Sequence, residues 1–347
     1  MAGVGRTGAA AILADSRDLS VVRSGFIALL FGLLGSRLAL APGGAAAQAS
    51  PPYVLRANWF VPDVATVLAR DNGSLARVGL DATYTVTTGS VPQMRGLSDG
   101  SYDLAYTSFD NVLAWSGREG AEIVAVAQTD GGVVLPLYVR PEVASWDDLR
   151  GKKLAVDAVD TAYALVLRRL LLAHDLDLDR GDYEMVAVGG GQQRLDSMVR
   201  GETSAAIMNA PANIAAAAAG MVLFADHREV VPDYPGTVIA VNRAWAEAHR
   251  DELVAFLRAW VAAGRATAAD RDAASQVLVR AVKAPPDQVA GLLPIDWQDG
   301  VLNRPGLRSV IDLRTRFGFA LLMGTDLSSY VDTSFYQAAV GVTSTEK

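Results

Sequence analysis

The sequence contains no cysteine among its 347 residues. This absence excludes disulfide bonds, thiolate-liganded metal sites and a cysteine nucleophile. It also excludes a lipid-modified cysteine at a mature N-terminus. We therefore expect an exported form of the chain to be soluble, or to be held at a membrane by other means.

Lysine is nearly absent, and it occurs only at Lys152, Lys153, Lys283 and Lys347. The formal net charge is −7, and about −9 remains after position 49 because the N-terminal stretch is basic. The chain lacks a basic stripe that could hold phosphate backbones. We therefore expect no nucleic-acid partner.

Familiar catalytic motifs are missing as well. The sequence has neither His-Glu-x-x-His nor Gly-x-Ser-x-Gly, the motifs of zinc peptidases and serine hydrolases. Its histidines, His174, His227 and His249, fall at predicted helix ends or in predicted surface loops. We expect no enzyme activity, no metal site and no cofactor.

The longest apolar run lies near the N-terminus, from Gly25 to Ala41, with Arg23 before it and Ala47-Gln48-Ala49 after it. A basic residue, an apolar run and a small-x-small triplet are typical of a signal peptide. We predict a signal peptide over residues 1–49, cleaved after Ala49, and a periplasmic location. The alternative is an amphipathic or membrane-anchoring helix.

The remaining chain has the pattern of an α/β protein. From Tyr53 on, short apolar runs alternate with helical stretches, which is typical of βα units that build mainly parallel sheets. After Asn242 the pattern is helical, most clearly at 244–271 and 303–322. Strands are expected at 54–57, 82–86, 103–106, 123–127, 133–139, 153–156, 183–188, 205–208 and 238–242.

A helix–glycine–strand pattern occurs twice, about 100 residues apart, at Gly100 and Gly201, and both glycines suit the left-handed residue that follows a helix. The repetition favours two lobes of similar construction, although this pattern is common in α/β proteins. Turn-rich stretches near 140–149 and 232–236 predict two crossovers and hence a hinge. The expected organisation is a discontinuous first lobe, residues 50–139 and 237–347, and a second lobe, residues 140–236.

Several segments in order resemble the periplasmic solute-binding proteins of the nitrate, sulfonate, taurine and thiamine-pyrimidine-precursor group. They are VLARDNGSLARVGLDATY (67–84), GSYDLAYTSFDNVLAW (100–115), SWDDLRGKKLAVDAVDTAYALVLRRLL (145–171) and GGGQQRLDSMVRGETSAAIMNAP (189–211). The string DLRGKKLAVD is the most specific of these. The resemblance implies the two-lobed type II periplasmic-binding-protein fold, with a helical C-terminal segment.

The resemblance also implies a function. A monomeric binding protein of this kind closes on a small organic molecule by a hinge motion and passes it to an ABC permease in the inner membrane. One alternative is an extracytoplasmic sensing module for a membrane receptor. A second is an oxyanion binder of the same fold, for sulfonate or nitrate. Pyrimidine-forming enzymes share the fold, but they resemble each other in a cysteine-rich motif that this chain lacks.

A ligand of such a protein is expected beyond the carboxyl ends of the strands. For Trp59 the alternative is core packing, and for Ser90 and Asp110 it is helix capping. The candidate ligand-binding residues of the first lobe are Asn58, Trp59, Phe60, Gly89, Ser90, Ser108, Asp110 and Thr129. Those of the second lobe are Asp157, Thr161, Gly189, Gly190 and Asn209.

Acidic side chains are frequent at these strand ends, at Asp110, Asp130, Asp157 and Asp160. A carboxylate ~4 Å from a bound anion would oppose it by about 4 kcal/mol at an effective dielectric constant of ~20. Arg194 is placed one turn into its helix and is not counted among the strand-end residues. We therefore expect a neutral or amine-bearing ligand. If the acids face away from the cleft, an anionic ligand becomes the expectation instead.

Overall fold

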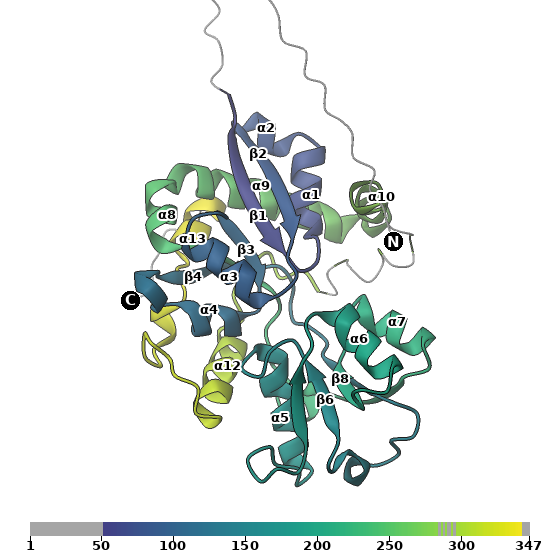
Figure 1. Cartoon of the computed structure of the whole chain (residues 1–347). Coiled ribbons are helices and arrows are strands. Elements are labelled where there is room, and N and C mark those ends of the chain that lie inside the picture. The colour runs from purple at the N-terminus through teal and green to yellow at the C-terminus, as the bar shows by residue number, and fades with distance from the viewer. Residues whose placement is uncertain (1–50, 284–285, 287–288, 290–292, 294–295, 342–347) are drawn as a thin grey trace, which may run out of the picture. The chain divides into compact units, whose positions relative to one another are not determined.

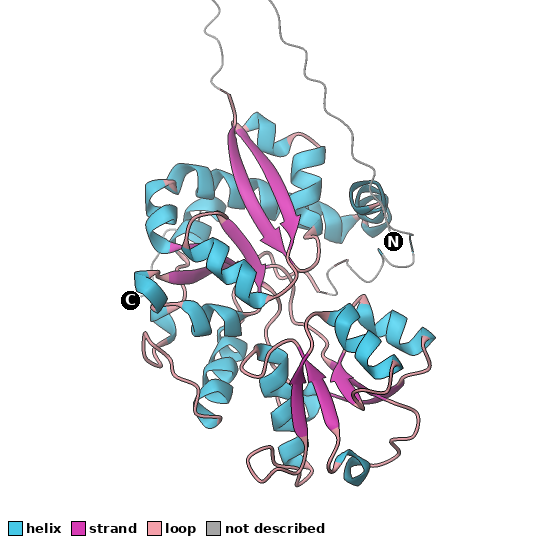
Figure 2. Ribbon diagram, viewed as in Figure 1, coloured by secondary structure: helices cyan, strands magenta, loops and turns pink. Residues whose placement is uncertain are grey.

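The computed structural model describes residues 51–283, 286, 289, 293 and 296–341. These residues belong to one compact unit that begins at Ser50. The signal peptide predicted over residues 1–49 lies outside the described residues. Two five-stranded sheets flanked by helices make up the unit (Figure 1, Figure 2), which confirms the α/β class.

The first sheet has the strand order β2-β1-β3-β10-β4. β1 pairs parallel with β2 and β3, whereas β10 returns from late in the chain and runs antiparallel to β3 and β4. β4 reads IVAVAQ and is buried along its whole length, as expected of a strand covered on both faces. The strands are β1 (Tyr53–Trp59), β2 (Leu80–Val86), β3 (Leu104–Thr107), β4 (Ile123–Gln128) and β10 (Val238–Asn242).

Helices connect these strands in βα units. They are α1 (Val64–Asp71), α2 (Ser74–Arg77), α3 (Ser90–Ser98), α4 (Phe109–Trp115) and the 3-10 turn η1 (Arg118–Gly120). We call this sheet, together with its helices, the first lobe.

The second sheet has the order β7-β6-β8-β5-β9. β6 pairs parallel with β7 and β8, and β5 runs antiparallel to β8 and β9. The strands are β5 (Pro136–Val139), β6 (Lys153–Val156), β7 (Glu184–Ala187), β8 (Ala205–Ile207) and β9 (Val222–Asp226). The helices are α5 (Ala162–Ala173), α6 (Gly191–Val199), α7 (Ala212–Ala218) and the 3-10 turns η2 (Trp146–Leu149) and η3 (His227–Glu229). We call this sheet and its helices the second lobe.

Two strands differ from the sequence prediction. β5 was expected in the first lobe, but it pairs in the second sheet, so the chain crosses between lobes after Gln128 and not near residue 140. β9 was not predicted at all. It is an edge strand whose Val222 and Leu223 are exposed, and it therefore lacks the buried–exposed alternation that marks a half-buried strand.

The C-terminal region is helical, as predicted, but its first long helix is divided. Residues 244–271, expected as one helix, belong to three, with breaks at His249 and Asp270. The carboxylate of Asp270 accepts the Ala273 N–H, and this N-cap starts a new helix. The elements are α8 (Arg243–Ala248), α9 (Arg250–Ala269), α10 (Arg271–Val282), α12 (Arg304–Arg316), η4 (Leu327–Ser329) and α13 (Ser334–Val340).

α12 joins the two lobes. Its apolar residues, among them Leu307 and Ile311, belong to a core cluster that also contains Leu113 of α4 and Leu167 of α5. The guanidinium of Arg314 on α12 is buried, and it donates to both carboxylate oxygens of Asp110 at 3.0 Å and to the Asp160 carbonyl at 3.1 Å. A single buried side chain thus ties α4 to the turn before α5.

The glycines of the repeated pattern have the predicted conformation, since Gly100 and Gly201 have φ of 79° and 76° and follow the C-caps of α3 and α6. One histidine prediction was wrong. His227 is buried, and its Nδ1 accepts the Leu135 N–H at 3.2 Å; burial lowers its pKa. Within the described ranges, no helix is both long and apolar enough to cross a bilayer.

Candidate functional site

Residues of both lobes line one cavity of about 710 Å³. Its walls are the residues that follow the strands and those that open the next helices, where ligands of open α/β sheets bind. A pocket of roughly 300–1,000 Å³ is the range that holds drug-sized organic molecules. The lining includes Phe60, Ser90, Thr107, Ser108 and Asn111 from the first lobe and Asp157, Thr161, Tyr163, Gly190, Arg194 and Asn209 from the second.

Three helices of nine or more residues, α3, α5 and α6, begin at this cavity. Within the described ranges, their N-cap residues Gly89, Thr161 and Gly190 make no side-chain capping bond. Of the helices that begin elsewhere, α1 and α10 are capped by the carboxylates of Asp63 and Asp270, whereas α9 has no side-chain cap. Free N–H groups and the positive end of the helix dipole therefore face the cavity from three directions.

Arg194 is the cation of the cavity. It is 4% exposed, and its Nη1 donates to the Gly189 carbonyl at 3.3 Å. Among the residues that the structure describes, no carboxylate lies within ion-pair distance of it and its Nε has no acceptor. Burial lowers its pKa, and the charge of Asp157 acts in the opposite direction. A guanidinium nevertheless stays protonated in proteins, so the cavity contains a buried cation that has a backbone carbonyl and the Tyr163 ring beside it but pairs with no carboxylate among the described residues.

A polar chain of side chains runs across the cavity from one lobe to the other. Asp157 accepts from Thr161 Oγ1 at 2.5 Å and from Ser90 Oγ at 3.4 Å. Asn111 then donates to Ser90 Oγ at 3.2 Å and to Thr107 Oγ1 at 2.8 Å. The carboxylate of Asp157 is thus partly satisfied by hydroxyl groups, one from each lobe.

Tyr234 adds a second unpartnered polar group. It comes from the return crossover, lines the cavity and is 3% exposed. Burial raises the pKa of its phenol well above the usual value, so it remains a neutral donor. Its hydroxyl has no hydrogen-bond partner among the described residues. A buried hydroxyl left in this way costs free energy, and a ligand acceptor would satisfy it.

One wall of the cavity is apolar. Ala212, Ala215 and Ala218 recur at helical spacing on α7, and Ile214 lies beside them. Phe60 lines the cavity from the first lobe. Phe60 and Ile214 are 37% and 44% exposed, so large apolar side chains of both lobes face open space here.

The structure brings together part of the predicted site. The candidates that line the cavity are Phe60, Ser90, Ser108, Asp157, Thr161, Gly190 and Asn209. Their contact with a ligand remains a prediction.

The other candidates lie outside the lining. Trp59 is fully buried in the core, its ring centroid 4.5 Å from that of Tyr84 and 5.6 Å from that of Tyr106, because alternation along β1 turns it inward. Asn58 is buried beside it and donates to Thr85 Oγ1.

The remaining four have local partners. Asp110 is paired with Arg314. Thr129 donates to the Asp130 carboxylate and to the Thr237 carbonyl. Gly89 and Gly189 each adjoin a lining residue without lining the cavity themselves.

The premise of the ligand-charge prediction is corrected. Of the four acids placed at the cleft, only Asp157 lines the cavity. Asp110 is neutralised by Arg314, and the Asp130 carboxylate accepts from Thr129 Oγ1 and from the Gly132 N–H. Sequence reasoning also missed Arg194. It follows the N-cap Gly190 by four residues, and helical side chains point back toward the N-terminus, so a residue one turn into the helix can reach the cavity.

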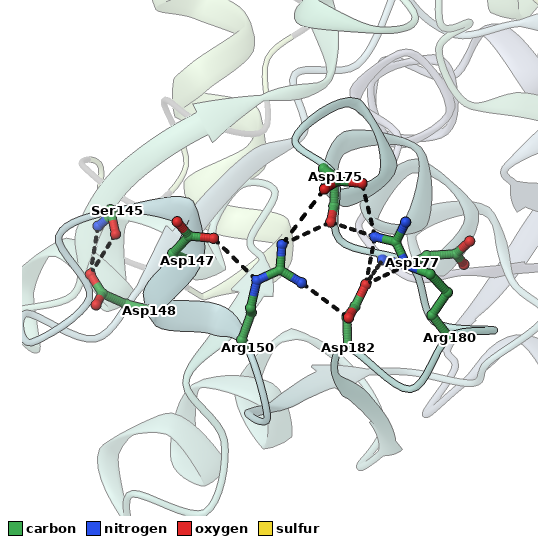
Figure 3. A network of polar contacts seen from close by, with 8 residues as sticks. All are labelled: Ser145, Asp147, Asp148, Arg150, Asp175, Asp177, Arg180 and Asp182. Atoms are coloured by element: carbon green, nitrogen blue, oxygen red, sulfur yellow. Dashed lines mark hydrogen bonds and ion pairs between the residues drawn. The ribbon is translucent and has the colours of Figure 1, made fainter.

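A separate acidic cluster lies in the loops before β6 and β7, away from the carboxyl ends of these strands (Figure 3). Arg150 pairs with Asp147 at 3.1 Å and with Asp182 at 3.0 Å, and Arg180 pairs with Asp175 at 3.0 Å. Asp147, Asp175 and Asp182 are therefore paired with arginines. Among the described residues, no group of three or more His, Asp or Glu could hold a metal ion.

Comparison with known proteins identifies the family. A family model described as NMT1-like matches residues 60–282. The chain belongs to the NMT1-like family. This confirms the resemblance, since solved proteins of the same fold include nitrate- and sulfonate-binding proteins. No curated protein matches the sequence significantly.

Solved structures agree on the fold of this NMT1-like protein. The ligand-binding component of an ABC-type import system from Staphylococcus aureus, solved with zinc bound, has 14% identity and a TM-score of 0.70, over 83% of this chain and 99% of that one. The periplasmic aliphatic sulphonate-binding protein of Escherichia coli has 18% identity and a TM-score of 0.63, over 82% and 99%. The periplasmic nitrate-binding protein of Synechocystis PCC 6803 has 12% identity and a TM-score of 0.68, over 84% and 89%. The fold is that of the periplasmic binding proteins.

Proposed function

We propose that this chain is the extracytoplasmic substrate-binding component of an ABC importer, and that it binds a small organic anion in the cavity between its lobes. The family and the fold support the transport role. The anionic ligand is supported by one observation above all, the buried and unpaired guanidinium of Arg194 among uncapped helix N-termini.

The energetics favour an anion at this place. A buried charge without a partner costs several kcal/mol, and a ligand anion would recover that cost through charge-assisted hydrogen bonds. The N-terminus of α6 adds free N–H groups and a favourable dipole. The carboxylate of Asp157 would repel an anion. It accepts hydrogen bonds from Thr161 and Ser90, and these bonds partly offset its negative charge.

The rest of the assignment follows from the transport role. We infer export through the N-terminal segment, a periplasmic location, a permease partner in the inner membrane and action as a monomer without catalysis. We place the lobe limits by the sheets, at about residues 50–130 and 237–341 for the first lobe and 131–236 for the second, with hinge closure on the ligand.

The decisive experiment is isothermal calorimetry with small carboxylates and sulfonates on the chain from Ser50 onward. Arg194→Gln removes the charge of the cavity, and we expect it to weaken the tightest-binding acid by about 100-fold, as loss of one partner of a buried charged pair does. Arg200→Gln is the matched control, because Arg200 is the C-cap residue of the same helix but is exposed and paired with Glu202. Equal affinities in Arg194→Gln and the unaltered chain would refute the anion site.

A further inference from the structure

The cavity presents two kinds of surface at once, and the occupant has to match both. Its polar lining includes the guanidinium of Arg194, the N-terminus of the nine-residue helix α6 and the Tyr234 hydroxyl. Both side chains are more than nine-tenths buried, and each has a polar atom without a partner among the described residues. These groups call for a compact acceptor such as a carboxylate or sulfonate.

The wall formed by α7, which packs beside the N-terminus of α6, is apolar. α7 reads ANIAAAA, and its cavity-facing residues are alanines and Ile214. A Cβ on Gly191 would collide with Ala212, so α6 and α7 approach closely here, and the alanines of α7 add little bulk to the cavity wall. Phe60 faces the same cavity from the first lobe.

The size of the cavity distinguishes inorganic oxyanions from larger organic acids as ligands. An inorganic oxyanion could occupy the Arg194 end but would leave Phe60 and Ile214 facing water. A cavity of about 710 Å³ lies within the range of pockets that enclose drug-sized molecules. Exposed apolar side chains grouped at a binding cavity indicate an apolar partner surface.

We propose that the ligand is an amphipathic organic acid, with a carboxylate or sulfonate at Arg194 and a bulky apolar part, aromatic or branched, between Phe60 and α7. The inference rests on the proposed function and adds the substrate class. Closing the lobes would bring Phe60 and Ile214 onto opposite sides of the apolar part and remove both from water.

Two matched series of acids test the proposal on the chain from Ser50 onward. Acetate, benzoate and 2-naphthoate form one series, and methanesulfonate, benzenesulfonate and 2-naphthalenesulfonate form the other. We expect affinity to rise at least tenfold from the methyl to the aromatic member in one series or both. We also expect benzamide, which is uncharged, to bind at least tenfold more weakly than benzoate if the carboxylates bind. The series that binds distinguishes a carboxylate from a sulfonate head group.

Substitutions in the cavity wall test where the apolar part of the ligand binds. Ile214→Asn and Phe60→Ser are expected to lower the aromatic-to-methyl affinity ratio at least threefold, one from each lobe. Val199→Asn is the control, because Val199 is also an exposed apolar residue but lies outside the cavity lining. Equal affinities across both series, or no binding by any member at millimolar concentration, would overturn the proposal.

Different results would contradict the amphipathic ligand and the anion-binding function. Arg194-dependent binding of acids without any size preference would sink the amphipathic ligand and leave the proposed anion-binding function intact. Tight binding that is indifferent to Arg194→Gln would sink both.

Discussion

Three buried or exposed arginines of the molecule differ in whether a carboxylate pairs with them. Arg194 has no carboxylate within ion-pair distance among the described residues, whereas Arg314 has Asp110 and Arg200 has Glu202. Sequence alone ranks these three arginines equally. Arg194 differs from Arg314 and Arg200 only because α6 places it at the cavity. For this reason the charge of the ligand was not predictable from the strand-end residues.

Asp130 offers a residue-scale test that does not depend on a ligand. Burial raises the pKa of its carboxyl group to about 6. The folded state therefore binds a proton more readily than the unfolded state, and stability should fall as the pH rises from about 4 to about 6. Burial also raises the pKa of Asp110 to about 6, so we expect Asp130→Asn to reduce this decline without abolishing it, and to raise the free energy of unfolding at pH 7 by about 1–3 kcal/mol. Urea denaturation across the pH range measures both effects.

Asp99 provides the control of opposite sign. Its exposed carboxylate accepts from the Ser101 N–H, and its hydrogen bonds with Ser101 lower its pKa. Asp99→Asn should therefore leave the decline between pH 4 and 6 in place. An unchanged decline in Asp130→Asn would contradict the assignment of the titration to Asp130.

At the scale of helices and strands, most of the fold was predictable because its signals are local. Apolar runs located eight of the nine predicted strands in their sheets, and glycine marked the ends of α3 and α6. The errors have a common origin in tertiary context. Which sheet β5 joins depends on its partners β8 and β9, and the edge position of β9 removes the alternation by which a strand is recognised.

The start of α12 gives an element-scale prediction whose sign opposes helix propensity. Gly306 lies in its first turn, and a Cβ there would overlap the carbonyl oxygen of Asp233 in the return crossover. Alanine is the better helix former by about 1 kcal/mol, yet we expect Gly306→Ala to lower the free energy of unfolding by about 1–3 kcal/mol because the backbone must shift. Chemical denaturation measures the change.

Ser309→Ala is the companion variant, since Ser309 is half-buried on the same helix and its hydroxyl donates to the Pro305 carbonyl. We expect it to change stability by no more than about 0.5 kcal/mol. A stabilised Gly306→Ala would show that the crossover yields easily and that close approach does not position α12.

At the scale of the whole molecule, the cavity and the contact between the lobes at α12 are formed by different elements. α12 packs on helices of both lobes, and Arg314 bridges them, while the walls of the cavity are formed by residues after the strands, by the starts of helices and by α7. Exposed apolar residues follow these strand ends on both lobes, with Val91 on the first and Val159 and Ile214 on the second. Their burial on closure would favour a closed, liganded form.

Small-angle scattering tests closure directly. We expect the radius of gyration of the chain from Ser50 onward to fall when a tightly binding acid is saturating, and to stay unchanged with the same acid in Arg194→Gln. A radius that does not respond to saturating ligand would contradict a hinge at the two crossovers.

The groups proposed to attract an anion into this cavity share one property, which is that they keep their charge or polarity across a wide range of pH. A guanidinium stays protonated throughout the physiological range, and backbone N–H groups at a helix end have no proton to lose. A site built from histidine would instead follow the acidity of the surroundings. Acidification of the medium therefore does not remove the positive charge of the site, and neither does a mildly alkaline medium. In the proposed transport role, release of the ligand would therefore depend on separation of the two lobes, a step that a membrane partner could drive, and not on the pH of the solution.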